Sequence, residues 1–336
     1  MQNILLTGAG FSRNWGGWLA GELFEYLIGC PEVARSASLR EKLWRNQREA
    51  KGFESALAEL QVANIFAPST ESLHDLRGLE RAIGSAFGHM NKHLCEQPFE
   101  WFDPPADPMK HFLARFDALF TLNQDLLLEH HYKPQGEISP NGDRWLDVQL
   151  PGMVPMPSIG SAEPSSHLAY VSAGAEYFLE HSQYQPLYKL HGSYGWSDNE
   201  NDSLLIMGDN KAHEIDRFGV LKWYFQRLQE SLRIPDTRLM IIGYSFQDEH
   251  INEVIVNAIR NYGVLIFVVD PTGSDIARNI LNKAVNASRP DLHKAAINLV
   301  DAFEKGLIGA SRRYLREIFK SDRIEYAKLM RFFERP

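Results

Sequence analysis

Short apolar runs that alternate with helical patterns constrain the fold of this chain more than any other feature of its sequence. Each run has the length of a single strand, and most are followed by a polar or glycine-rich turn and then a helical pattern. The runs are residues 3–7, 118–121, 187–190, 204–207, 239–242 and 264–269. Strands that alternate with helices form parallel sheets covered by helices on both faces. The alternation therefore predicts an α/β fold with a doubly wound, mainly parallel, Rossmann-like sheet.

The apolar spacing also predicts how the chain is divided. Residues 36–95 show helical spacing without strand-like alternation, which is too long for one crossover helix and predicts a helical insertion over residues 31–108. The sheet domain then comprises residues 1–30 and 109–290, and residues 291–336 form a C-terminal helical appendage. Residues 133–164 hold four glycines and six prolines among 32 positions, which predicts an irregular loop.

Composition excludes several classes of function. The chain has 35 Lys and Arg against 43 Asp and Glu among 336 residues, a net charge of −8. This charge disfavours tight binding to nucleic acid through the bulk surface, and we expect no direct sequence-specific nucleic-acid binding. The longest apolar run in the C-terminal half, residues 264–269, is far shorter than the roughly 20 residues that cross a bilayer. We expect no membrane association.

Cysteine and histidine usage bears on the compartment and on metals. The two cysteines, Cys30 and Cys95, can form neither a disulfide framework nor a cysteine-based zinc site within one chain. With no secretory leader pattern at the start, this usage favours a cytoplasmic protein. The pair His130 and His131, and His213, lack companions at ligand spacing. We therefore predict no metal.

Four turns follow the predicted strands and carry the chemistry-bearing residues. They are residues 8–12, 123–125, 191–193 and 243–245. Each turn alone is explained by turn geometry or helix capping. Because the loops that leave the carboxyl ends of parallel strands converge on one crevice, the four together predict a ligand-binding site.

The first turn favours a dinucleotide ligand. Gly8, Ala9 and Gly10 lack bulky side chains, so backbone N–H groups at the start of the next helix could approach a diphosphate. Arg13 occupies the place of the third small residue in the dehydrogenase fingerprint, and no Gly-Lys-Ser/Thr follows. Neither an ordinary dehydrogenase nor a phosphate-loop nucleotidase is favoured.

The four turns resemble the motifs of sirtuins, in sirtuin order. The segments are TGAGFS (7–12), TLNQD (121–125), KLHGS (189–193) and GYSF (243–246), beside the sirtuin patterns GAGxS, TQNxD, HG and GTS. The resemblance extends from residue 7 to about residue 272. Two departures stand against protein deacylation: the four zinc-binding cysteines of the deacylases are missing, and their Pro-Asp-Phe-Arg segment is replaced around residues 16–19.

The chain is therefore similar to the sirtuin-like domains of bacterial anti-phage systems, which cleave NAD+ to nicotinamide and ADP-ribose. The resemblance implies that Asn123 and His191 are the essential pair and that NAD+ is the substrate. The residues that we expect to bind the nucleotide lie in or just after the strand-end turns: Gly8, Ala9, Gly10, Ser12, Asp125, Gly243, Ser245 and Asp270. Capping or turn roles stay open for Asp125 and Asp270, and Ser245 and Asp248 have the spacing of a capping box.

The pair also suits the chemistry of this cleavage. Nicotinamide leaves a cationic pyridinium as a neutral molecule, so no general acid and no pair of carboxylates is required. The site must orient a water and accept its proton, which an amide and an imidazole can do.

Function and partners follow from the same resemblance as expectations. An effector that depletes NAD+ during abortive infection must be held inactive until triggered. We therefore expect a homo-oligomer and a sensor partner, a HerA-type ATPase or a short argonaute-like protein. The alternatives are a non-catalytic subunit that binds NAD or ADP-ribose as a regulator or scaffold, and a sirtuin-type protein deacylase.

Overall fold

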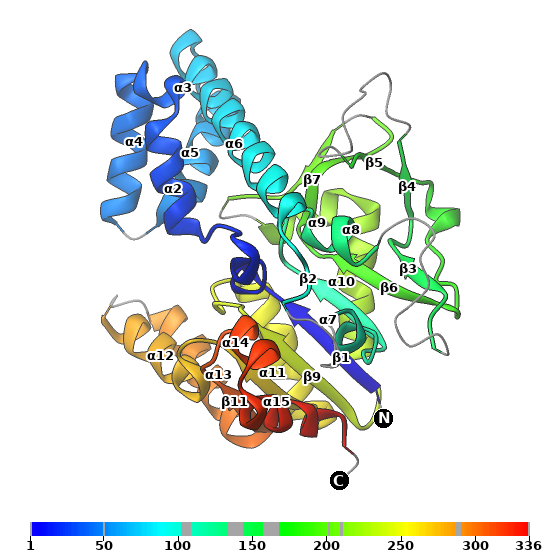
Figure 1. Ribbon diagram of the computed structural model, residues 1–336. Helices are drawn as coiled ribbons and strands as arrows, with labels where there is room; N and C mark the ends of the chain where they lie inside the picture. Colours follow the sequence, from blue (N-terminus) through cyan, green and yellow to red (C-terminus); the bar gives the residue numbers. More distant parts are fainter. Residues whose placement is uncertain are drawn as a thin grey trace.

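A central parallel sheet organises the chain. The computed structural model describes residues 2–49, 51–101, 109–133, 144–156, 168–200, 202–208, 211–286 and 290–334. Seven strands pair in the order β11-β10-β9-β1-β2-β6-β3, every pair parallel (Figure 1). They are β1 (Gln2–Thr7), β2 (Ala118–Thr121), β3 (Asp147–Gln149), β6 (Tyr184–Lys189), β9 (Thr237–Ile242), β10 (Leu265–Val269) and β11 (Leu307–Ser311). This architecture confirms the predicted α/β fold with a Rossmann-like sheet.

The centre of the sheet is buried on both faces. All six residues of β9 are buried, as are residues 4–7 of β1. Strands covered on both faces have nearly continuous apolar sequences. This is why these strands appear in the sequence as short apolar runs between helical segments. Because the chain passes from β1 to β2 on one side and returns to β9 on the other, the strand order reverses beside β1, where open α/β sheets bind ligands.

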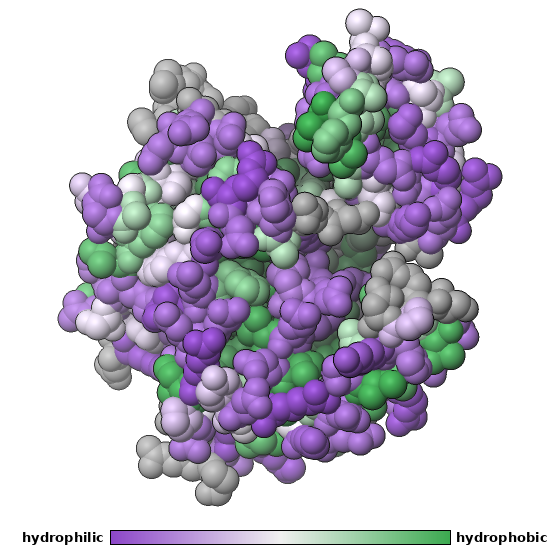
Figure 2. Space-filling view, turned by 180° about the vertical axis from the view of Figure 1, so that it is seen from behind, coloured by the Kyte–Doolittle hydropathy of each residue, from purple (hydrophilic) through white to green (hydrophobic). Residues whose placement is uncertain are grey.

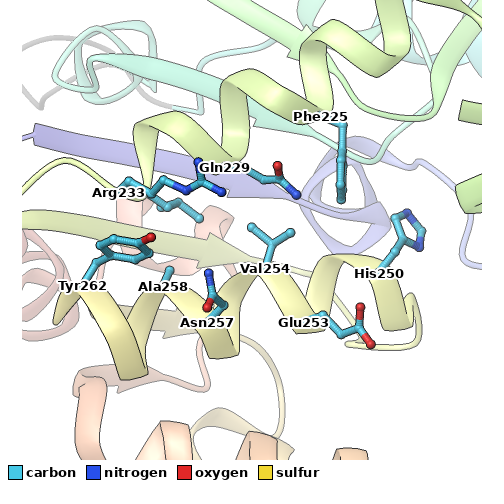
Figure 3. A pocket seen from close by; sticks show the side chains of 10 residues that line it. Phe225, Gln229, Arg233, His250, Glu253, Val254, Asn257, Ala258 and Tyr262 are labelled. Atoms are coloured by element: carbon cyan, nitrogen blue, oxygen red, sulfur yellow. The ribbon is translucent and has the colours of Figure 1, made fainter. Parts of the chain in front are cut away.

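Helices cover the sheet. Those of the sheet region are α1 (Ala9–Ser12), α7 (Met109–Leu113), α8 (Leu127–His131), α9 (Lys211–Arg217), α10 (Gly219–Ser231), α11 (Glu249–Tyr262), α12 (Ile276–Asn286), α13 (Pro290–Gly306), α14 (Leu315–Lys320) and α15 (Arg323–Met330). Helices α10 and α11 lie side by side in front of β1 and β9 (Figure 3). No helix within the described ranges has the length and apolar character needed to span a membrane.

A helical bundle stands beside the sheet. It consists of α2 (Ala20–Gly29), α3 (Pro31–Ala34), α4 (Ala37–Arg48), α5 (Gly52–Phe66) and α6 (Thr70–Glu96). Ser36 and Ser69 cap α4 and α6 by accepting from the N–H groups of Leu39 and Ser72. The long helix α6 runs from the tip of the bundle down to the sheet (Figure 1). Seen from behind, the bundle forms a separate lobe with an indentation beside it (Figure 2).

The structure differs from the sequence expectations in its strands. A second sheet has the order β4-β5-β7-β8, from β4 (Met153–Pro155), β5 (Tyr170–Ser172), β7 (Gly192–Ser197) and β8 (Ser203–Leu205). The run 204–207, predicted as a strand of the parallel sheet, instead supplies β8, which pairs antiparallel with β7. The pattern missed β7 because its two glycines interrupt any apolar alternation.

Two predicted segments also need correction. The stretch 133–164, expected to be an irregular loop, contains β3 and β4 in its described part, and residues 134–143 and 157–164 lie outside the described residues. The predicted helical appendage contributes β11 to the edge of the central sheet. Its sequence, LIGAS, is short and contains glycine and alanine, so it carries no strand signal.

Candidate active site

The four turns lie together at one edge of the sheet. The strands that precede them, β9, β1, β2 and β6, are consecutive neighbours in the sheet and run in the same direction. Their last residues are in register: Thr7 pairs with both Thr121 and Ile242, and Thr121 pairs with Lys189. The structure thus brings the residues of all four turns to the place where the strand order reverses.

The first and fourth turns pack directly on each other. The N–H of Gly8 donates to the Ile242 carbonyl at 3.0 Å, and that of Gly10 donates to the Gly243 carbonyl at 2.9 Å. Gly243 has φ +63°, and a Cβ there would lie 2.3 Å from backbone atoms of Gly10 and Phe11. These glycines allow two strand ends to meet, so the amides of Gly8 and Gly10 have partners within the protein. Binding of a diphosphate at this turn stays a prediction.

The helix after the first turn is very short. Helix α1 has only four residues, and a 3₁₀ turn over Arg13–Trp15 follows it. Ala9 is exposed at its start, and Ser12 is buried at its end. What the first turn presents toward the neighbouring strand end is therefore the hydroxyl of Ser12.

Asn123 is held by the ends of β1 and β2. Its side-chain Nδ2 donates to Ser12 Oγ at 2.9 Å, and its backbone N–H donates to Thr121 Oγ1 at 3.0 Å. The Thr7 and Thr121 hydroxyls bond to each other at 2.8 Å, which connects the two strands beneath the turn. Asn123 is only 8% exposed, so its carboxamide has a fixed orientation at the edge of the sheet.

A buried ion pair supports the turn that carries Asn123. Lys189, at the end of β6, forms a salt bridge with Glu129 Oε1 at 2.6 Å and also donates to the carbonyl oxygen of Asp125. The side chains of Lys189 and Glu129 are 1% and 0% exposed. Breaking a buried pair leaves an uncompensated charge, so Glu129 holds Lys189 in place. Because Lys189 also donates to the carbonyl oxygen of Asp125, it fixes the backbone of the turn. Lys189 lies in the KLHGS motif, but nothing in the sequence indicates its role in this ion pair.

Asp125 is directed into the protein. Its Oδ1 accepts from the N–H of Leu127 at 3.1 Å, at the start of α8. This is the capping or turn role that was the alternative to nucleotide binding for Asp125. Burial raises the pKa of Asp125, an effect that Lys189 and a hydrogen bond from Ser12 oppose. Ser12 thus hydrogen-bonds the side chains of both Asn123 and Asp125.

His191 follows β6 and is 3% exposed. Its Nε2 lies 3.3 Å from Nε2 of His250, in the first turn of α11. Burial lowers the pKa of His191 to about 3, because the nearby carboxylate of Asp248 only partly offsets it while Lys211 and His250 add to the shift. The imidazole is therefore neutral at pH 7.

Charged residues from three elements meet beside His191. Lys211, on α9, lies 3.0 Å from Asp248 Oδ1 and 2.9 Å from Glu54 Oε2 of the helical bundle. Burial raises the pKa of Asp248, but the charge of Lys211 and its hydrogen bond hold that pKa below its usual value. This ion-pair network connects the bundle to the sheet next to the site.

The capping box proposed for Ser245 and Asp248 is wrong. Asp248 occupies the N-cap position of α11 but makes no side-chain cap bond, and its carboxylate binds Lys211 instead. Ser245 is exposed. His250 was not predicted from the sequence as a site residue. The available signal was its position, since it follows the fourth turn closely.

Asp270 lies one strand further along the same edge, after β10. Its Oδ1 accepts from the backbone N–H and the hydroxyl of Thr272, at 2.8 and 2.6 Å. This is the arrangement of a turn-forming aspartate, which was the alternative to nucleotide binding for Asp270. No group of three or more His, Cys, Asp or Glu side chains in the described ranges is placed to hold a metal ion.

The buried imidazole predicts a pH-dependent stability. The folded-state pKa of His191 is below the unfolded value of about 6.5, so the unfolded state binds more protons as the pH falls through that value. Stability is retained above about pH 6.5 and decreases on acidification. From pH 7 to pH 5 this group should lower the free energy of unfolding by about 2 kcal/mol.

Urea unfolding at the two pH values measures this effect. His191→Gln should show a loss on acidification that is smaller than the wild-type loss by about 2 kcal/mol. Replacing the exposed His74 of α6 with Gln is the matched control and should leave the wild-type loss unchanged. An equal loss in wild type and His191→Gln would show that His191 is not buried in its neutral form.

Comparison with protein families assigns part of the chain to a known domain family. The family model described as SIR2-like domain matches residues 117–288, about half of the chain. The match includes the second, third and fourth turns, while the first glycine turn precedes it. A search of curated proteins finds no match.

Proposed function

Because the chain belongs to the SIR2-like domain family, whose function is related to NAD, we propose that it is an NAD+ glycohydrolase that releases nicotinamide and ADP-ribose. The observation that carries the proposal is the placement of Asn123 and His191. Thr121 and Lys189 are partners in neighbouring parallel strands, and each member of the pair lies two residues beyond one of them. An amide and a neutral imidazole therefore occupy matching positions on adjacent strand ends.

The proposed chemistry uses both groups. The C–N bond between the ribose anomeric carbon and the pyridinium breaks, and nicotinamide keeps the bonding electrons and leaves as a neutral molecule. Water forms the new C–O bond, and its proton passes to His191. Asn123 hydrogen-bonds the water or a ribose hydroxyl, since a carboxamide can both donate and accept.

The low pKa of His191 is compatible with this role. The transition state of glycosidic cleavage has oxocarbenium character, and such a carbon reacts readily with water. The water therefore needs orientation and a neutral acceptor for its proton more than a strong base. Burial supplies the neutral form, and the hydrogen bond from Asn123 to Ser12 supplies the orientation.

We also propose the biological setting that the resemblance implies. The protein would act in the bacterial cytoplasm as an effector of anti-phage defence that depletes NAD+. A homo-oligomer, and a HerA-type ATPase or short argonaute-like protein encoded nearby, would control it. Nicotinamide release that rises on adding the products of neighbouring genes would support this setting, and release that is independent of them would argue against it.

Product analysis tests the proposed reaction. Purified protein is incubated with NAD+, alone and with its genetic neighbours, and the products are separated by chromatography. Equal amounts of nicotinamide and ADP-ribose are expected. O-acyl-ADP-ribose formed from an acylated peptide would identify a deacylase, and binding of NAD+ without turnover under every condition would identify a binding subunit.

Ser12→Ala should lower the rate of NAD+ cleavage by about 2-fold to 10-fold. The substitution removes the hydroxyl that accepts from Asn123, and one such hydrogen bond contributes about 0.5–1.5 kcal/mol. The control is Ser231→Ala, which replaces another buried serine at the end of α10, away from the turns. Equal rates in the two variants would show that Ser12 does not orient Asn123.

A further inference from the structure

A second imidazole lies against the proposed base. The Nε2 atoms of His191 and His250 are 3.3 Å apart, and the ring centroids are 5.4 Å apart. Two imidazole nitrogens can share a hydrogen bond only when one carries a proton and the other does not. The contact therefore couples the tautomers of the two rings: when His191 donates through Nε2, its Nδ1 is left free to accept a proton and His250 Nε2 is the acceptor.

Burial and the nearby charges together keep both rings of this pair neutral at rest. Asp248 from α11 and Lys211 from α9 act on both rings, and Lys211 is itself paired with Glu54 of α5. Burial lowers the pKa of both histidines, and the carboxylate of Asp248 opposes this. Both rings are thus neutral at rest, and Asp248 stabilises the pair once it holds an extra proton.

His250 also connects the buried base to solvent. It lies at one end of a groove of about 290 Å³ between α10 and α11 (Figure 3). Phe225 of α10 packs near its ring, with centroids 5.8 Å apart, and Glu253 lines the groove one turn further along α11. His191 is 3% exposed whereas His250 is half-buried and lines the groove. A proton on His191 therefore has a route to water through His250.

We propose that His250 is a positioning residue for His191, holding its tautomer through the Nε2 contact and passing the proton that it accepts to water in the groove between α10 and α11. The inference rests on the proposed function. The proton balance is closed: water gives one proton to Nδ1 of His191 as the C–O bond forms, His191 passes its Nε2 proton to Nε2 of His250, and His250 releases its Nδ1 proton to solvent. No oxidant or reductant takes part.

His250→Ala tests the proposal through activity. We expect kcat/KM for NAD+ to fall by about 10-fold to 100-fold, the usual cost of losing a partner that orients a functional histidine. His250→Gln, which retains a hydrogen-bonding side chain, should lose less. His74→Ala, a remote exposed histidine on α6, should lose nothing.

Two further readouts separate positioning from a purely structural role. Added imidazole should restore part of the activity of His250→Ala by entering the space left open to the groove, and it should not restore Asn123→Ala, which keeps both rings. The acid limb of the pH profile should move to higher pH in His250→Ala. Water admitted beside His191 and the loss of a neighbouring imidazole both raise the pKa of His191.

A measurement without turnover distinguishes failure of this inference from failure of the proposed function. Long-range ¹H–¹⁵N correlation spectra report the tautomer of each histidine ring. One tautomer of His191 should dominate in the wild type and in His250→Gln, and a mixture should appear in His250→Ala. An unchanged His191 tautomer in His250→Ala would overturn the proposal, as would wild-type kcat/KM and pH profile in that variant. If the tautomer changes but no protein form cleaves NAD+, the positioning stands and the proposed function fails.

Discussion

His191→Gln is expected to lower the rate of NAD+ cleavage by about 10²-fold to 10⁴-fold, the usual contribution of a general base. Glutamine has a polar side chain but cannot accept the proton of water at neutral pH. The expected loss exceeds that for Ser12 or His250 because His191 alone is proposed to receive the proton directly. Initial rates of nicotinamide release at saturating NAD+ measure it.

Asn123→Ala should also lower the rate of NAD+ cleavage, because the water or ribose hydroxyl loses its hydrogen-bonding partner while the imidazole stays in place. The control is Asn261→Ala, at the exposed end of α11. Far-UV circular dichroism and thermal unfolding of each variant check that the fold is retained. Wild-type rates in folded His191→Gln and Asn123→Ala would refute the assignment of both residues.

Gly243→Ala is expected to destabilise the protein by about 2–5 kcal/mol. A left-handed conformation costs a non-glycine residue about 1–2 kcal/mol, and Gly243 has φ +63°. The new Cβ would also lie 2.3 Å from the backbone of Gly10 and Phe11, and backbone atoms cannot rotate away as a side chain can. Such overpacking costs a further 1–3 kcal/mol or so.

The chain provides a matched control for this substitution. Gly263, after α11, has φ +67°, and a Cβ there would meet no atom within 4 Å. Gly263→Ala should therefore show only the conformational cost of about 1–2 kcal/mol. Urea unfolding of both variants isolates the packing of the first turn against the fourth. Equal destabilisation would show that the two strand ends do not require this close approach.

Strands with continuous apolar runs could be predicted from the sequence, and strands that contain glycine could not. The apolar runs of β1, β9 and β10 are continuous because helices cover both faces. The strand β11 contains glycine and alanine at the sheet edge, and β7 contains two glycines, so neither has a periodic pattern. An apolar run is visible in the sequence, whereas a strand that contains glycine depends on tertiary pairing and is not.

The turns that build the site were predictable for a related reason, and their detailed roles were not. Parallel strands place their carboxyl ends at one edge, so the convergence of residues 8–12, 123–125, 191–193 and 243–245 followed from strand type alone. That Gly8 and Gly10 bond to the β9 turn depends on tertiary packing. The same holds for His250, which meets His191 from a position 59 residues away in the chain.

The central claim is that Asn123 and His191 act on one carbon of a bound dinucleotide, and a crystal structure of the inactive His191→Gln variant with NAD+ tests it most directly. We predict that the anomeric carbon of the nicotinamide ribose lies beside the side chains of both positions, at the ends of β2 and β6. A dinucleotide bound elsewhere, or bound with that carbon turned away from both side chains, would contradict the account.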